Sequence, residues 1–518
     1  MLFACPVTDD FFRSRIDHMI DLRHPLAVLA SRMPWQEIEA RVAQVFSRKG
    51  RAGVAMPDLD LFGEQVQRVA VASNAGRPRV PLRVMIALLY LKHAVNESDE
   101  GVVARWADTP RWQFFSGCAY YEDRQPCDAT TLVKFRQLLG EEGVEELLAQ
   151  TINVAVDLKL IKPQELTRVI VDSTVQHKAI AHPTDSRLLE TARTKLVEEA
   201  KEVGIDLKQT FAKEGKDLTR KAGRYAHARQ FKRMRRAIKR QSTIVGRLQR
   251  EVDRKASAIG AAVRQALGET LNKARRIVAQ SGQRKATGGQ PKLYAWHASE
   301  VDCISKGKAR QPYEFGVKVG IASTLSGNLI VGARAFHGNP YDGHTLHEQL
   351  EQAAILMQDS RAKPATAFVD LGYRGVDAQN PDVHIVHRGK SKRISEQERK
   401  QLRRRQAIEP IIGHTKSDGL LERNHLAGAT GDAINAILVA AGFVATPSAR
   451  ARPNHGGPGT QASPDLQAPP IRGHQLIFHQ QQHTPARAAS AIAPGQPQHP
   501  REHHRSPIRH GRDLPFSG

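Results

Sequence analysis

The sequence contains few cysteines and no long hydrophobic run. Its four cysteines, in a chain of 518 residues, form no C-x-x-C pair and stand at Cys5, Cys118, Cys127 and Cys303. This spacing argues against a disulfide framework and against a zinc site, and it favours reduced thiols. The longest apolar stretch, Ile434–Ala445, has about 12 residues, whereas a membrane-spanning helix needs roughly 18. We therefore expect a protein without a membrane partner.

The beginning of the chain lacks the features of a secretory signal. Residues Met1–Pro6 do not combine a basic segment with a following apolar stretch. A signal peptide requires both. We therefore expect a cytoplasmic protein, associated with the nucleoid if its partner is DNA.

Acidic residues are far fewer than basic residues. Asp and Glu number 53 against 77 Lys and Arg, which gives a net charge of +24 and an isoelectric point near 10.1. This excess favours a polyanionic partner, with nucleic acid as the first candidate and an anionic membrane surface as the alternative.

Half of the positive excess lies in Arg220–Lys255, which holds 14 basic and two acidic residues. A solvated helix face would explain such a run, but its charge density favours contact with phosphates. The candidate DNA-binding residues of this run are Arg233, Arg236, Lys239 and Arg240.

Helical periodicity dominates the first part of the chain. Apolar residues recur every three to four positions between Phe11 and Ile161, as in amphipathic helices. We therefore predict an all-α N-terminal domain over residues 1–161. Pro81–Phe115 allows a helix-turn-helix unit, although many all-α domains contain two helices joined by a short turn. A second helical segment, about 186–290, has no strand-like stretch and is predicted to be a basic insertion.

Strand-like segments flank the predicted insertion. β-Branched and apolar residues fill the first of them, and alternating segments follow the insertion. The predicted strands are Leu166–Val175, Tyr313–Ala322, Asn328–Phe336, Ala365–Leu371 and Val383–His387, and the predicted helices are Gly343–Gln358 and one that begins after Ser395. This order predicts an α/β core with a mixed sheet over residues 162–445.

The last segment, from about Thr446, differs in composition from the rest. It holds 12 of the 28 prolines and eight of the 22 histidines, but no lysine. Such a composition without periodicity cannot bury a core, so we predict a disordered tail over residues 446–518. We hypothesise that the reading frame changes near Phe443–Pro447.

Three acidic residues stand where a carboxylate is costly or unexpected. Asp172 interrupts the apolar strand VIVDST, Asp370 ends the strand AFVDL, and Glu409 belongs to the final helix. A buried carboxylate needs a cation, hydrogen bonds or a metal. Two carboxylates on neighbouring strands and a third from a helix would suit Mg²⁺, which prefers oxygen ligands. Two such ions about 3.5–4 Å apart stabilise the attacking and leaving oxygens of a phosphodiester.

Each acid also has a purely structural alternative. Asp172 would cap the turn that follows it, and Asp370 would be a turn residue. Glu409 precedes Pro410, which places it either at a helix start or beside a kink. Asp342, in GNPYDGHTL, would line the same cleft or cap a helix.

Several segments together resemble bacterial insertion-sequence transposases of the IS-five type. They are VDSTVQ around Asp172, PYEFGVKV (Pro312–Val319), GNPYDGHTL (Gly338–Leu346), VDLGYRG around Asp370 and AIEPIIGHTKSDGLLERNHLAGATGDAIN (Ala407–Asn435). The resemblance covers about Phe11–Gly442. These enzymes carry the helix signature Tyr-x2-Arg-x3-Glu-x6-Lys. Arg405, Glu409 and Lys416 fit this spacing, and Leu402 stands at the tyrosine position.

The resemblance implies an RNase H-like core whose triad Asp172, Asp370 and Glu409 is both catalytic and metal-binding. It implies two Mg²⁺ ions, with Mn²⁺ as a substitute. The reaction would be hydrolysis at the transposon ends, followed by attack of the freed 3′-hydroxyl on target DNA. Because two ends are handled together, we expect a homodimer or larger assembly on double-stranded DNA, namely the terminal inverted repeats and the target.

The resemblance also directs attention to basic and aromatic residues near the triad. Arg405 and Lys416 are expected to neutralise phosphates, unless they belong to an ordinary basic helix face. Tyr373 and Arg374 follow Asp370 and are further candidates for contact with the DNA backbone. The helical N-terminal domain is expected to bind the repeats and to support assembly.

Two other functions remain open. A related nuclease would cleave DNA without joining it. An inactive transposase relic would bind its DNA ends without cleaving them.

Overall fold

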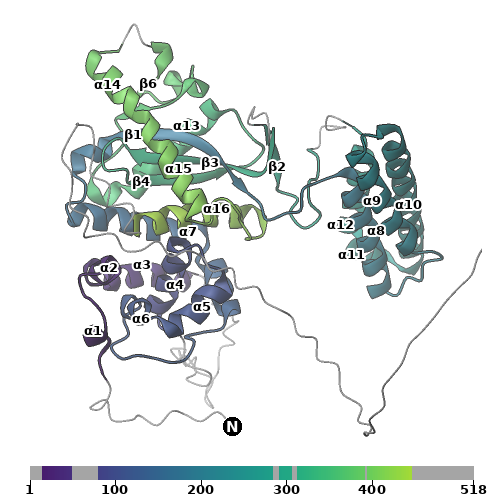
Figure 1. The fold of residues 1–518 in the computed structure, drawn as a ribbon, viewed down its shortest axis with the longest axis horizontal. Helices are drawn as coiled ribbons and strands as arrows, with labels where there is room; N and C mark the ends of the chain where they lie inside the picture. The colour runs from purple at the N-terminus through teal and green to yellow at the C-terminus, as the bar shows by residue number, and fades with distance from the viewer. Residues whose placement is uncertain (1–13, 49–79, 284–290, 306–311, 391–393, 446–518) are drawn as a thin grey trace, which may run out of the picture. The chain divides into compact units, whose positions relative to one another are not determined.

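The structure is a computed structural model that describes residues 14–48, 80–283, 291–305, 312–390 and 394–445 (Figure 1). The predicted tail 446–518 and Cys5 lie outside the described residues. These ranges contain both helices and a mixed β-sheet, which confirms the predicted α/β class. No helix found in them is both long and apolar enough to cross a membrane.

The N-terminal part is helical wherever it is described. Side-chain caps explain where two of its helices begin: Ser98 accepts a hydrogen bond from the Gly101 amide, and Asp128 from the Thr130 amide, each at 2.8 Å. The helices are α1 (Ile16–Met19), α2 (Pro25–Arg32), α3 (Trp35–Arg48), α4 (Leu82–Ala94), α5 (Asp99–Asp108), α6 (Pro110–Phe115) and α7 (Ala129–Asp157). Gly140 interrupts α7 with a φ of 67°, a conformation that suits glycine.

The strands of the described chain form one mixed sheet. Its order is β2-β3-β1-β5-β6, and β4 pairs with β3. β1 is antiparallel to β3 and parallel to β5, and β5 is parallel to β6. The strands are β1 (Arg168–His177), β2 (Asp302–Ser305), β3 (Tyr313–Thr324), β4 (Ile330–Phe336), β5 (Thr366–Phe368) and β6 (His384–Val386). All but β2 lie where strands are predicted; β2 is too short to show an alternating pattern.

Four helices of the second half pack on the sheet or next to it. α13 contacts β3 and β4, α15 contacts β1, and α16 contacts β4 together with α4 and α7 (Figure 1). They are α13 (Asp342–Leu356), α14 (Glu396–Arg404), α15 (Ile408–Ser417) and α16 (Gly428–Ala445). Ser395 caps α14 in a reciprocal contact with Glu398, so the helix begins where the sequence predicts.

Helix α4 departs from the amphipathic character expected for it. Every residue from Val84 to His93 is buried, because α3, α5, α6, α7 and α16 pack around this helix. Lys92 therefore needs a partner, and it shares Asp99 with Arg136, at 2.7 and 2.9 Å. Burial alone would raise the pKa of Asp99, but the two cations lower it to about 2.

One hydrophobic cluster runs from the N-terminal helices through the sheet to α16. The apolar run that ends the described chain is part of it, since Ile434 and Ile437–Ala441 are buried. α16 approaches α4 so closely at Gly442 that a Cβ there would lie 2.8 Å from the Cβ of His93. The longest apolar run of the sequence is thus a core helix.

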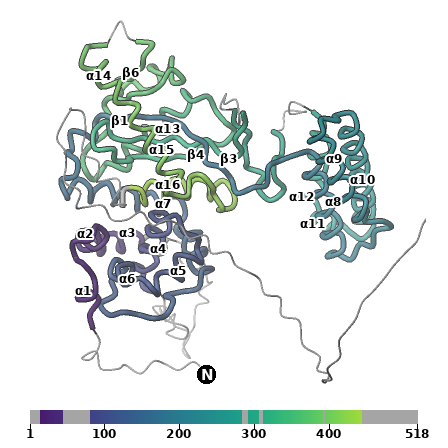
Figure 2. The backbone as a smooth tube through the Cα atoms, in the orientation of Figure 1, coloured from purple at the N-terminus to yellow at the C-terminus, as the bar shows by residue number. Residues whose placement is uncertain are grey.

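The segment between β1 and β2 is a helical insertion with a core of its own. Figure 2 shows that the backbone leaves the sheet after β1, forms these helices and then returns. They are α8 (Asp185–Glu202), α9 (Ala212–His227), α10 (Phe231–Ile259), α11 (Ala261–Ala266) and α12 (Gly268–Gln280). Leucine, isoleucine and valine side chains from α8, α10 and α12 form a separate hydrophobic cluster, to which Trp296 also belongs.

Candidate active site

Asp172 lies on β1, and Asp370 lies nearby, just after the end of the neighbouring strand β5. Asp172 is at the centre of β1, and Asp370 comes two residues after the end of β5. The parallel register pairs Ile170 with Phe368. The pairing ends there, two residues before each aspartate, and Asp370 lies close enough for its charge to raise the pKa of Asp172. The side chain of Asp370 also accepts a hydrogen bond from the Gly372 amide at 2.8 Å, which fixes the turn that follows β5.

Arg405 contacts Asp172 directly. Its Nη1 donates to Asp172 Oδ2 at 3.0 Å, and the two side chains are only 16% and 20% exposed. The Ser173 amide donates to the other oxygen, Oδ1, at 2.8 Å. Burial raises the pKa of Asp172, as does the carboxylate of Asp370, whereas Ser173 and Arg405 oppose this rise. The ion pair therefore offsets part of the cost of placing a carboxylate within the sheet.

Glu409 belongs to the helix that Arg405 precedes, but its side chain stands apart. A 3₁₀ turn, Arg405–Ala407, separates α14 from α15, and Glu409 lies exposed in the first turn of α15. Of the two alternatives left by Pro410, the helix start is therefore the correct one. Across the part of the chain that the structure describes, no three acidic, histidine or cysteine side chains converge closely enough to hold a metal ion.

The other two positions of the helix signature lie in different surroundings. Leu402, at the tyrosine position, is 9% exposed and packs in the main hydrophobic cluster. Lys416 lies at the end of α15, 3.9 Å from Glu422 Oε2. It lines a hollow of about 970 Å³ that Arg423 and Arg136 also line. The leucine thus serves packing, while the lysine belongs to a partly basic hollow.

Tyr373 and Arg374 point in different directions from one short turn. Tyr373 is 1% exposed, and its hydroxyl forms no hydrogen bond with the described residues, although it lies beside Ser173. Burial and the charges of Asp342, Asp172 and Asp370 raise the pKa of Tyr373 well above its usual value. Arg374 is exposed, and its Nε donates to the Leu371 carbonyl at 3.2 Å.

Sequence reasoning leaves the role of Asp342 undecided and overlooks two residues beside it, Ser173 and Lys318. Ser173 Oγ donates to Asp342 Oδ1 at 3.0 Å, and Lys318 Nζ lies 2.9 Å from the same oxygen. Asp342 is also the first residue of α13, so it lies both at a helix start and next to the aspartates. The segment GNPYDGHTL contains the signal for Asp342; nothing in the sequence connects it to Lys318, 24 positions earlier.

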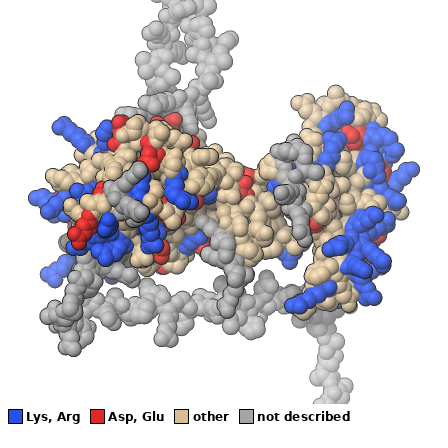
Figure 3. All heavy atoms as spheres, turned by 90° about the horizontal axis from the view of Figure 1, so that it is seen from above, with Lys and Arg blue, Asp and Glu red and all other residues tan. Residues whose placement is uncertain are grey.

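The four candidate DNA-binding residues of the insertion lie on α10. Arg233, Arg236 and Lys239 are exposed, whereas Arg240 pairs with Glu214 of α9 at 2.7 Å. Figure 3 shows Lys and Arg side chains gathered on the surface of the insertion, with few acidic side chains among them. The sequence run thus becomes a basic surface on a folded pair of helices.

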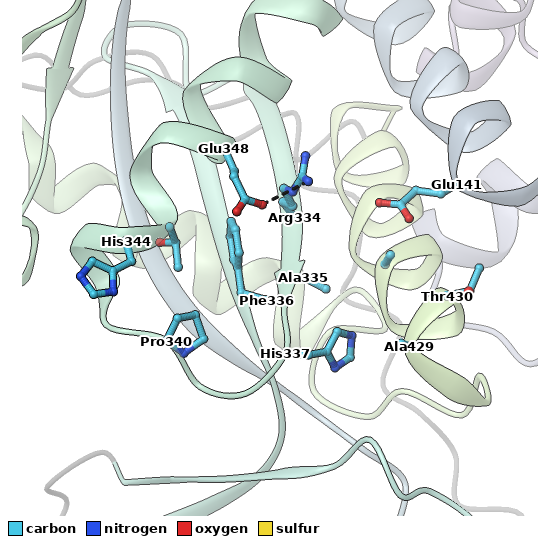
Figure 4. A pocket seen from close by; sticks show the side chains of 12 residues that line it. Glu141, Arg334, Ala335, Phe336, His337, Pro340, His344, Glu348, Ala429 and Thr430 are labelled. Atoms are coloured by element: carbon cyan, nitrogen blue, oxygen red, sulfur yellow. Dashed lines mark ion pairs between the residues drawn. The ribbon is translucent and has the colours of Figure 1, made fainter. Parts of the chain in front are cut away.

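A separate cavity lies between β4, the start of α13 and α16. It has a volume of about 530 Å³ and is lined by the ion pair Arg334–Glu348, by His337 and His344, and by Glu141 of α7 (Figure 4). Neither Asp172, Asp370 nor Glu409 lines it. The candidate active site is therefore not this cavity but the surface where β1 and the end of β5 meet α15.

Comparison with known proteins connects this arrangement to a family. The family model described as "Transposase domain (DUF772)" matches residues 56–138, which include α4, α5 and α6. The chain is also 41% identical over 223 residues to a protein of Rhizobium meliloti described as "Uncharacterized protein ORF8 in nfe locus". The matched part covers 43% of this chain and 95% of that protein. No solved structure gives a significant match. The chain therefore belongs to one family with this rhizobial protein and contains a match to a transposase domain.

Proposed function

We propose that the protein is a DDE-type DNA transposase of the IS-five type with an RNase H-like core. It binds the terminal inverted repeats of an insertion sequence and carries out metal-dependent strand cleavage and strand transfer. Asp172, Asp370 and Glu409 form its triad. The observation that carries this proposal is the proximity of Asp172 on β1 to Asp370, just after the parallel neighbour β5. Arg405, four residues before Glu409, contacts Asp172.

The two aspartates suit Mg²⁺ as a cofactor. They offer carboxylate oxygens on one side of a sheet, and the buried Tyr373 hydroxyl nearby lacks a partner among the described residues. Mg²⁺ is commonly held by one or two carboxylates together with water and substrate phosphates, so two aspartates are a sufficient core. Glu409 would complete the set. Bound at this place, two Mg²⁺ ions, or Mn²⁺ in their stead, would polarise the phosphodiester and stabilise the attacking and leaving oxygens.

In this proposal Arg405 and Lys416 contact the phosphates of the DNA backbone. Arg405 holds Asp172 through one guanidinium nitrogen, and its remaining N–H groups are available to a phosphate. Lys416 reaches the backbone from the other end of α15. Exposed Arg374 is a third contact, whereas Tyr373 is buried and would act beside the acids. These cations would hold a DNA phosphate next to Asp172, where the proposed catalytic carboxylates can act on it.

The basic insertion and the N-terminal helices would bind DNA outside the cleavage site. Arg233, Arg236 and Lys239 are exposed on α10, where they can contact phosphates, although Arg233 also donates to Gln230 Oε1 at 3.1 Å. Arg240 would first have to leave Glu214. Two inverted repeats handled together require a homodimer or larger assembly. The residues matched by the transposase-domain model belong to the helical N-terminal part, which supports a role of that part in transposition.

One observation favours a second candidate function. The Glu409 side chain is exposed, and no group of three acidic, histidine or cysteine side chains within the described residues is close enough to hold a metal ion. A protein that never brings Glu409 to the two aspartates would bind its DNA ends without cleaving them, as an inactive relic does. A nuclease without joining activity is the remaining alternative.

A cleavage assay separates these functions. The full chain is incubated with a labelled DNA end from its own flanking repeats, with Mg²⁺ or with EDTA, and both cleaved and joined products are measured. We expect Mg²⁺-dependent products that fall by roughly 100-fold or more in Asp172→Asn and in Glu409→Gln, because each removes a charge required in the transition state. Glu396→Gln, an exposed acid at the start of α14, is the matched control and should retain activity.

The products identify the correct alternative. Binding without cleavage by the folded wild-type chain would establish the relic, and cleavage without joining would establish the nuclease. Full activity of Glu409→Gln would remove Glu409 from the triad.

A further inference from the structure

Asp342 is an acidic residue to which the proposed function gives no role. Its Oδ1 accepts a hydrogen bond from Ser173 Oγ at 3.0 Å and pairs with Lys318 Nζ at 2.9 Å. Lys318 is buried on β3, and Ser173 directly follows Asp172 on β1. These contacts fix one oxygen of Asp342 beside the strand that carries Asp172.

The other oxygen of Asp342 faces Asp370 across Gly372. A Cβ at Gly372 would lie 3.2 Å from Asp342 Oδ2 and 3.0 Å from Asp370 Oδ1. The two oxygens thus flank one small gap, which stays open because glycine has no side chain. Asp370 Oδ1 already accepts a hydrogen bond from the Gly372 amide at 2.8 Å, but two carboxylate oxygens that face the same gap still repel each other, and a cation between them would offset this repulsion.

The two faces of the sheet meet at this point. Consecutive residues of a strand point to opposite faces, so Asp172 with Arg405 and Ser173 with Asp342 lie on different sides of β1. Because β5 ends at Phe368, two residues before Asp370, no further strand pairing shields Asp370 from either side. Asp370 is therefore accessible to Asp172 from one face and to Asp342 from the other.

The hydroxyl of Tyr373 supplies an independent observation. It is buried on the turn that packs against α13, beside the Ser173 hydroxyl, and no hydrogen bond of ordinary geometry satisfies it within the described chain. The charges that act on it most strongly are those of Asp342, Asp172 and Asp370. A buried hydroxyl without a well-formed hydrogen bond is energetically unfavourable. Such a donor, directed toward three carboxylates, indicates that a further polar group belongs among them.

We propose that Asp342 is a further carboxylate of the divalent-cation site, and that it binds a cation together with Asp370 from the α13 side of the sheet. This inference rests on the proposed function, since it takes Asp370 to be shared with the triad. Lys318 and Ser173 hold Asp342 in place, and Gly372 leaves the necessary space. Tyr373 provides a hydrogen-bond donor to an oxygen in that space.

Binding of Mn²⁺ to the full chain tests the proposal without any assay of activity. Free Mn²⁺ is measured by electron paramagnetic resonance during titration of the wild type, Asp342→Asn and Gly372→Ala. Asp342→Asn keeps the shape of the side chain but removes its charge, and Gly372→Ala fills the gap with a methyl group. We expect each change to weaken Mn²⁺ binding by tenfold or more, on the order of the loss that follows removal of a group supporting a metal site.

Each variant has a matched control. Glu348→Gln removes an exposed carboxylate from the same helix, α13, and Gly413→Ala adds a methyl group to α15 where no atom lies within 4 Å. Both should bind Mn²⁺ like the wild type. Circular dichroism verifies that every variant is folded, and the glycine variant tests the site even if Asp342→Asn does not fold.

The outcomes distinguish this inference from the function on which it rests. A wild-type chain that binds no Mn²⁺, or binds it equally well as Asp172→Asn, would overturn both. If Asp172→Asn weakens binding while Asp342→Asn and Gly372→Ala behave like their controls, the proposed function stands and Asp342 is not part of the site.

Discussion

His93 lies on α4 with its ring enclosed by protein. Its Nδ1 lies 3.0 Å from the Leu89 carbonyl, while Nε2 has no hydrogen-bond partner in the described residues. Burial and the positive charge of Lys92 lower the pKa of His93 to about 3. The imidazole is therefore neutral in the folded protein at any pH at which the chain is expected to work.

This neutral histidine predicts a loss of stability in acid. In the unfolded chain His93 takes up its proton near pH 6.5, but in the folded chain only near its lowered pKa, so stability falls as the pH drops between these values. Over that range one proton changes the free energy of unfolding by about 1.4 kcal/mol per pH unit. We expect His93→Gln to lose less stability than the wild type between pH 6.5 and 4.5, measured by urea unfolding.

A histidine on the surface provides the control for this prediction. His18→Gln changes an exposed side chain and should follow the wild-type curve. If His93→Gln and the wild type lose the same stability over the interval, His93 does not cause the acid sensitivity.

At the scale of elements, the contact between α4 and α16 depends on a glycine. A Cβ at Gly442 would lie 2.8 Å from the Cβ of His93 and 2.9 Å from the amide nitrogen of Ala94. Both atoms belong to or adjoin the backbone of α4, so neither can move without moving that helix. The N-terminal helices and the sheet share one hydrophobic cluster, in which this contact is one of the links.

We therefore predict that Gly442→Ala destabilises the protein. Overpacking of a tight contact costs about 1–3 kcal/mol, which outweighs the gain in helix propensity of about 1 kcal/mol. Thermal unfolding of the full chain measures the change. Gly223→Ala on α9, where no atom lies within 4 Å, should be at least as stable as the wild type. Equal stability of the two variants would show that α4 and α16 are not in tight contact.

The second prediction at this scale concerns the helix pair α9 and α10. Arg233→Ala combined with Arg236→Ala should weaken DNA binding without regard to sequence and reduce the slope of log K against log salt by about 0.9 for each lost phosphate contact. Fluorescence anisotropy with a repeat-containing duplex at several salt concentrations measures this slope. Arg361→Ala combined with Lys363→Ala removes two exposed charges outside the insertion. A slope that changes equally in both double variants would mean that net charge, not the insertion, determines binding.

At the scale of the whole molecule, the sequence predicts element types better than their surroundings. Alternating and helical periodicities locate most of the described strands and helices, because these patterns depend on local sequence. Strand β2 escapes prediction since it is only four residues long. The amphipathic character expected of α4 is wrong because five other helices contact it, and such enclosure depends on residues far apart in the sequence.

In the candidate site, too, the sequence identifies individual residues, whereas only the fold shows which of them are in contact. Asp172 and Asp370 stand out in the sequence because each interrupts or ends an apolar strand, and the structure places them near each other, on β1 and just after β5. The roles of Asp172, Asp370 and Glu409 in catalysis stay predictions. Arg405 has the expected spacing from Glu409, but its ion pair with Asp172 spans 233 positions and only the fold reveals it. The same holds for Asp342 with Ser173 and Lys318.

By itself, then, the sequence determined the elements, the basic insertion and the acids, since each depends on the chemistry of neighbouring residues. Only the tertiary structure decided which of these acids meet. It sets Asp172 beside Asp370 because β1 and β5 pair in parallel, and it sets Asp342 behind them because α13 starts next to Ser173. It also leaves Glu409 exposed, because the 3₁₀ turn before α15 directs Arg405 rather than Glu409 toward Asp172. Such distances follow from strand register and helix packing, which no local pattern in the sequence specifies.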